Sequence, residues 1–185
     1  MKKFLTLFFF PTLFILSCNN GNDDSEDGNS KLIIPQEIKT YNPLDLSEWG
    51  LDVMLYVPDS SVGLPQVSIN NANETEVKVG DYYQIAILEG GDLELKKADL
   101  KEDLLFKCAI VQEDSTSILY YAQLPDGSKT FYHFYAIVKI NDINYELHDI
   151  ETGEVMPEKA ASRMLTAAKF LQPKKATEVT ENKIQ

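Results

Sequence analysis

The sequence predicts an α+β fold in which a mostly antiparallel β-sheet is covered by a mid-chain helix and a C-terminal helix, as an α/β/α sandwich. Two helical segments are indicated, one following Asp92 and one between Pro157 and Pro173. Strands interrupted by one helix, then a meander and a packed helix, are typical of this class. The meander is predicted from four β-rich runs separated by hairpin-type turn signals, at 105–111, 118–124, 130–140 and 143–149.

The chain begins with the features of an export signal. Lys2 and Lys3 precede an apolar run that extends to Leu16, a pattern typical of a secretory signal peptide. The run is shorter than the ~20 apolar residues that a membrane-spanning helix needs. It ends in Ile15-Leu16-Ser17-Cys18, which resembles the lipobox of bacterial lipoproteins. The resemblance implies removal of residues 1–17 and attachment of lipid to Cys18; the alternative is an ordinary signal peptide with an incidental cysteine.

Residues 18–45 are predicted to be the lipidated cysteine and a disordered acidic tether. Residues 19–30 contain no apolar side chain and therefore cannot enter a core. The acidic run after Cys18 is similar to the export signal of surface lipoproteins of the Bacteroidota. This resemblance implies export to the cell surface. The predicted location is the outer membrane, with a lipid anchor, on its periplasmic face or at the cell surface.

The folded domain is predicted to cover residues 46–172, followed by a flexible tail at 173–185. Its first half contains strand candidates at 51–57, 67–69, 74–79 and 82–88, the last two joined by a turn at Gly80-Asp81. Asp92 is expected to cap a helix that runs to about Asp103. Leu93, Leu100 and Leu104 are expected to face inward from that helix.

In the second half, both faces of the run 130–140 are largely apolar, which predicts a central strand that is covered on both sides. A turn at Asn141-Asp142 would place Ile140 opposite Ile143. The final helix carries an apolar, alanine-rich stripe that would pack closely on the sheet. The order of elements over about residues 51–171 resembles the PsbP-type sandwich, a likeness of architecture that implies no function.

Composition limits the possible partners. The formal charge of −12 includes the two lysines of the leader, so the rest of the chain is more acidic still. An acidic body repels nucleic acid and anionic lipid headgroups. With Cys18 lipidated, Cys108 has no cysteine to pair with, and its apolar surroundings predict a small buried side chain. Two histidines without metal-ligand spacing predict no zinc site, and no cofactor is expected.

The candidates for chemistry are His133, His148 and Asp149. Pairing about Asn141-Asp142 would bring His133 near the end of the following strand, so that the three could meet. No nucleophile elbow or glycine-rich loop accompanies them, which favours a structural role over catalysis.

Four further positions are candidates for binding or modification. Trp49, Tyr132 and Tyr135 could contribute a binding face, because tryptophan and tyrosine are enriched in binding hot spots; the alternative is that they pack against the core. Asp114-Ser115-Thr116 resembles the O-glycosylation sequon of Bacteroidota, which implies modification of Ser115 in a turn.

The sequence therefore favours a non-enzymatic outer-membrane lipoprotein. It would be anchored to the membrane through Cys18 and act as a protein-binding or accessory module of the cell envelope. One alternative is an inhibitor or immunity-type protein that binds a basic partner, which the acidic composition suggests. Another is a hydrolase or ligand-binding enzyme that uses His133, His148 and Asp149.

Overall fold

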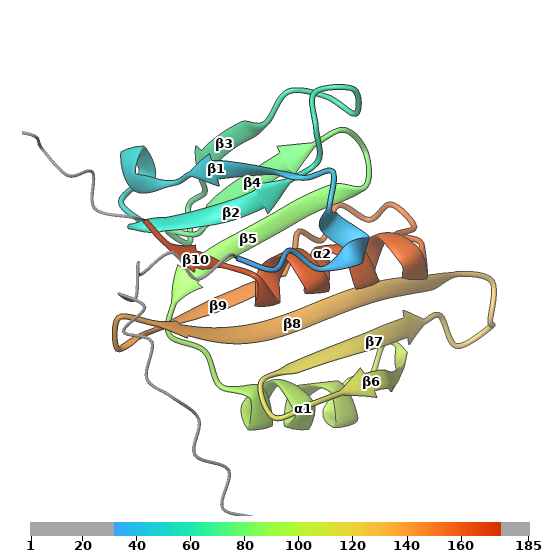
Figure 1. The fold of residues 1–185 in the computed structure, drawn as a ribbon. Coiled ribbons are helices and arrows are strands. Elements are labelled where there is room, and N and C mark those ends of the chain that lie inside the picture. The colour runs from blue at the N-terminus through green and yellow to red at the C-terminus, as the bar shows by residue number, and fades with distance from the viewer. Residues whose placement is uncertain (1–31, 175–185) are drawn as a thin grey trace, which may run out of the picture. The chain divides into compact units, whose positions relative to one another are not determined.

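A seven-stranded antiparallel sheet forms the centre of the fold (Figure 1). The computed structural model describes residues 32–174, so the predicted leader, Cys18 and the acidic run lie outside the described residues. The strand order is β3-β4-β5-β9-β8-β7-β6. The bounds are β3 (Gln66–Ile69), β4 (Thr75–Val79), β5 (Tyr83–Glu89), β6 (Lys107–Glu113), β7 (Ser117–Gln123), β8 (Thr130–Ile140) and β9 (Ile143–Asp149).

The β8–β9 hairpin has the predicted register. Ile140 lies opposite Ile143, and Tyr135 lies opposite His148. Asn141 and Asp142 both have positive φ angles, 49° and 66°, as a two-residue hairpin turn of the type I′ class requires. Because β9 also pairs with β5, this hairpin joins the first half of the chain to the meander.

Helix α2 (Glu158–Lys169) covers one face of this sheet and packs on β8, β5, β7 and β9. Its apolar stripe is buried, as the sequence predicts, with Ala161, Met164 and Ala168 fully inaccessible to solvent. The side chains of Phe134 and Ala136 meet it from β8. The small alanines allow the helix to approach the sheet closely, and this layer contains the main core.

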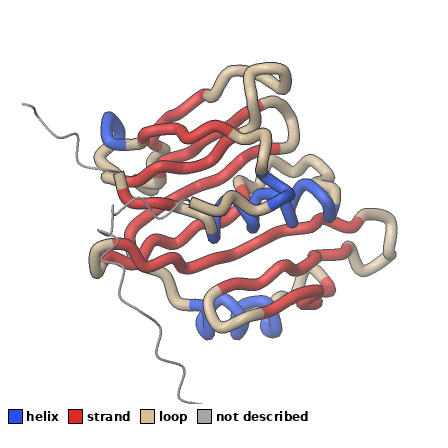
Figure 2. Tube along the Cα trace, in the orientation of Figure 1, coloured by secondary structure: helices blue, strands red, loops and turns tan. Residues whose placement is uncertain are grey.

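Helix α1 (Leu93–Glu102) lies on the opposite face and packs on β6 and β8 (Figure 2). It contributes Leu93 to a smaller core with Ile118, Tyr120 and Tyr135. The two helices on opposite faces confirm the predicted α+β class. The prediction that Leu104 faces inward is wrong, because the helix ends at Glu102 and Leu104 is 96% exposed.

A second, three-stranded sheet has the order β1-β2-β10, formed by β1 (Asn42–Asp45), β2 (Val53–Val57) and β10 (Gln172–Pro173). Two short 3-10 helices, η1 (Gln36–Ile38) and η2 (Ser47–Trp49), flank β1. Regular structure therefore begins before the predicted boundary at residue 46, and Ile38 is completely buried. Pro43 interrupts the sequence pattern but is tolerated because β1 is an edge strand.

Within residues 32–174, neither helix has the length and apolar character needed to cross a membrane.

Candidate functional site

The three candidate catalytic residues from the sequence, His133, His148 and Asp149, make contacts at Asp149, which ends β9. Its side chain is 4% exposed, and Oδ2 lies 2.7 Å from Nδ1 of His133. The backbone N–H of Phe134 donates to the other oxygen, Oδ1, at 2.9 Å. His148 Nδ1 lies 2.9 Å from the backbone carbonyl oxygen of Asp149. The hairpin register therefore brings the side chains of His133 and Asp149 together, whereas His148 contacts its neighbour Asp149 only at the backbone and lines a different cavity from His133.

The His133 ring is held by one carboxylate and one aromatic ring. Within the described part of the chain, Asp149 is the one side chain that hydrogen-bonds to the ring, and the Tyr120 ring stacks on it at 5.2 Å between centroids. Cys108 lines the same cavity. Burial, followed by the nearby Asp103 carboxylate, raises the pKa of its thiol, which opposes formation of a nucleophilic thiolate.

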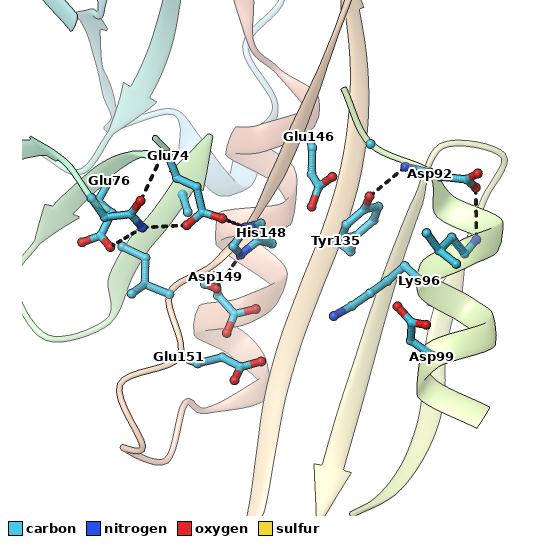
Figure 3. A pocket seen from close by; sticks show the side chains of 15 residues that line it. Glu74, Glu76, Asp92, Lys96, Asp99, Tyr135, Glu146, His148, Asp149 and Glu151 are labelled. Atoms are coloured by element: carbon cyan, nitrogen blue, oxygen red, sulfur yellow. Dashed lines mark hydrogen bonds and ion pairs between the residues drawn. The ribbon is translucent and has the colours of Figure 1, made fainter. Parts of the chain in front are cut away.

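A groove with a volume of about 770 Å³ opens beside this cluster (Figure 3). It exists because α1 covers the sheet only over β6 to β8, which leaves the same face of β4, β5 and β9 open. Helix α1 forms one wall through Leu95, Lys96 and Asp99, and the β3–β4 hairpin forms the other. Ala86 and His148 lie between the two walls, on β5 and β9.

The groove is strongly acidic. Seven carboxylates line it, against one lysine and one histidine. Several of these carboxylates have partners: Glu76 pairs with Lys78, and Glu74 lies 3.6 Å from Nε2 of His148. Within residues 32–174, three other carboxylates of the groove form no ion pair: Asp99, Glu146 and Glu151. The carboxylates of the groove are Glu74, Glu76, Asp92, Asp99, Glu146, Asp149 and Glu151.

Two contacts fix the α1 wall relative to the sheet. The side chain of Asp92 caps the helix by accepting the backbone N–H groups of Glu94 and Leu95, while its own N–H donates to the Tyr135 hydroxyl at 3.0 Å. Gly91 precedes it with a φ of 101°, and a Cβ there would lie 3.0 Å from Glu146. This close approach explains why the chain enters α1 through a glycine.

Tyr135 and Lys96 form the boundary of the groove nearest to α1. Burial, together with the carboxylate of Glu146, raises the pKa of the Tyr135 hydroxyl. The Lys96 amine lies 5.4 Å from the centre of the Tyr120 ring and 6.0 Å from that of Tyr135, a cation–π arrangement. Figure 3 shows Lys96 reaching from α1 toward the groove.

The other candidates selected from the sequence lie apart from the groove. Tyr132 lies on the α2 side of β8 with its ring against Tyr121, and Trp49 packs on the main core. Only Tyr135 of the three aromatic candidates lines the groove. Ser115 is exposed in the β6–β7 turn, next to Asp114, whose carboxylate accepts hydrogen bonds from Thr116 and Ser117.

Within residues 32–174, no group of three or more histidine, cysteine or acidic side chains is arranged to hold a metal ion. No protein-family model, curated protein or solved structure matches the chain. The groove and the Asp149 cluster are therefore the features from which a function can be inferred.

Proposed function

We propose that this chain is a non-enzymatic, lipid-anchored module of the outer membrane that binds a basic protein partner through the acidic groove. The observation that carries the proposal is the groove itself. It combines an open sheet face with carboxylates that have no cationic partner among the described residues. An inhibitor or immunity-type protein that neutralises a basic partner is one form of this function.

Electrostatics supports this choice of partner. A hollow lined by charges of one sign focuses the field and attracts ligands of the opposite sign. The chain as a whole is also acidic, with a formal charge of −12, so the field of the groove is reinforced by the rest of the body. Nucleic acids and anionic headgroups are repelled by the same field.

A lysine homopeptide is a suitable probe of this charge. We expect the full chain to bind it with an affinity that falls as salt is added, because screening weakens exposed charges. Replacing Asp99, Glu146 and Glu151 with their amides should weaken binding about tenfold, on the basis of ~0.5 kcal/mol for each charge removed. The measurement is fluorescence anisotropy of the labelled peptide over a range of salt concentrations.

A matched control variant distinguishes binding in the groove from attraction to the acidic surface as a whole. Glu37, Glu48 and Glu158 are exposed and line no part of the groove, and their replacement with glutamine removes the same charge. The control variant should bind as the wild type does, within about twofold. Equal weakening in both triple variants, or affinity that does not respond to salt, would contradict the proposal.

A further inference from the structure

A second pocket adjoins the acidic groove and has a different character. It has a volume of about 250 Å³ and lies between α1, the face of β6–β8 and the segment after Asp149. We call it the anchor pocket. Its apolar side chains include Leu100, Phe106, Tyr120, Ala122, Phe131 and Met156.

The walls of the anchor pocket are only partly covered. Phe106 and Phe131 meet edge to face at 6.1 Å between ring centroids, yet both rings remain half-buried. Leu100 and Cys108 are half-buried too. Apolar side chains left open in a concave site with a few polar groups are typical of a ligand pocket, and here His133 and Asp149 supply the polar groups.

The two sites are continuous. Lys96, Asp99, Asp149, Ile150 and Glu151 line both the groove and the anchor pocket. A ligand in the groove therefore passes directly over the opening of the pocket. Asp103 and Glu154 add two more carboxylates on the pocket side, so the apolar walls lie within acidic surroundings.

From this continuity, which rests on the function proposed above, we infer that the partner presents a basic segment carrying one bulky apolar side chain. The cationic residues of the segment lie in the groove, and the apolar side chain fills the anchor pocket. A cavity of about 150 Å³ holds a benzene ring, so the pocket has space for one phenylalanine or leucine side chain. This arrangement of a central apolar anchor with polar surroundings is common to protein interfaces.

Cys108 provides a direct reporter of pocket occupancy. The sequence contains two cysteines, so the full chain with Cys18→Ser has Cys108 as its only thiol. The probes are a lysine peptide with one central phenylalanine and the same peptide with alanine in its place. We expect the phenylalanine peptide to bind at least about tenfold more tightly, because burial of the ring adds to the charge attraction. Only that peptide should slow alkylation of Cys108 by iodoacetamide.

Filling the pocket tests the same inference without the thiol reporter. Ala122→Leu and Cys108→Leu each add side-chain volume to the pocket. Both variants should lose the preference for phenylalanine while keeping the affinity of the wild type for the alanine peptide. Two positions are used so that misfolding of one variant, detected by circular dichroism, still leaves a test.

The outcomes distinguish the two proposals. If no lysine peptide binds, the proposed function fails. If both peptides bind equally in a salt-dependent way and Cys108 stays unprotected, the groove function stands and the anchor pocket is overturned. If free phenethylamine protects Cys108 as well as the phenylalanine peptide does, the pocket serves a small amphipathic amine, and the inferred segment is overturned.

Discussion

Asp149 connects the fold to the site at the level of a single residue. Both of its carboxylate oxygens are used, one by His133 and one by the backbone N–H of Phe134. Its carbonyl oxygen meets His148. Because it lines both the groove and the anchor pocket, it holds the junction between them.

We predict that Asp149→Ala lowers the free energy of unfolding by about 3 kcal/mol. The change leaves a buried N–H group and the His133 ring without their partner, and unsatisfied buried groups are costly. Urea denaturation measures the effect. Asp99→Ala is the control, since Asp99 is exposed and should change stability by less than about 0.5 kcal/mol. Equal stability of the two variants would show that the Asp149 contacts are not stabilising.

A second carboxylate, that of Asp114, makes a pH-dependent contribution to the stability of the protein. The Lys169 ammonium on α2, together with hydrogen bonds in the β6–β7 turn, holds the pKa of Asp114 well below its usual range. Because the folded pKa is depressed, the stabilisation is complete above the unfolded pKa of ~4 and is lost as the pH falls toward the folded value. Both side chains are more than a third exposed, so the contribution is at most about 1 kcal/mol.

Lys169→Met should therefore destabilise the protein at neutral pH by at most about 1 kcal/mol, and by progressively less below pH ~4. Urea denaturation over a range of pH follows this difference. Lys159→Met is the matched control, because Lys159 is on the same helix and makes no ion pair within residues 32–174. A difference between wild type and Lys169→Met that does not change with pH would rule out the ion pair as its cause.

At the scale of elements, α1 decides where the groove lies. Its first residue, Leu93, is 7% exposed and packs in the smaller core, whereas Leu104 just after the helix is 96% exposed. We predict that Leu93→Ala costs about 2 kcal/mol in the free energy of unfolding. Leu104→Ala should cost less than about 0.5 kcal/mol. Equal costs for the two changes would show that α1 is not held through Leu93.

The C-terminal end of α1 could not be predicted from the spacing of its apolar residues. The spacing of Leu93, Leu100 and Leu104 fits a longer helix. In the structure, Asp103 instead accepts the N–H groups of Leu105 and Phe106 through its side chain. Such side-chain bonds compete with the helix, so the chain leaves α1 and Leu104 points into solvent.

The strands in the rest of the second half of the chain could be predicted from local sequence patterns. The bounds of β8 and β9, and the pairing of Ile140 with Ile143, follow from the Asn141-Asp142 turn. The same register indicated that His133 and Asp149 could meet. Pairing of β9 with β5 and the position of α1 on the sheet depend on contacts between residues far apart in the chain. The groove, which requires both, could not be predicted from local patterns.

At the scale of the whole molecule, the proposed function needs the body to be held at a membrane. The lipobox-like sequence Ile15-Leu16-Ser17-Cys18 supports anchoring through Cys18. Cys18→Ser should release the protein from the membrane fraction, since a lipidated cysteine carrying several chains is needed for stable attachment. Cell fractionation and intact mass measure this. Cys108→Ser is the control and should stay in the membrane fraction; release of both variants would contradict lipidation at Cys18.

Site-specific photo-cross-linking in the native cells can show whether a basic partner binds in the acidic groove. A photoreactive residue would replace Leu95, which is exposed and lines the groove, or Leu64, which is exposed and lies outside it. We predict cross-linking of a basic envelope protein from position 95 and not from position 64, and loss of that product when Asp99, Glu146 and Glu151 are changed to amides. Cross-linking of the same partner equally from both positions, or no product above background from position 95, would contradict it.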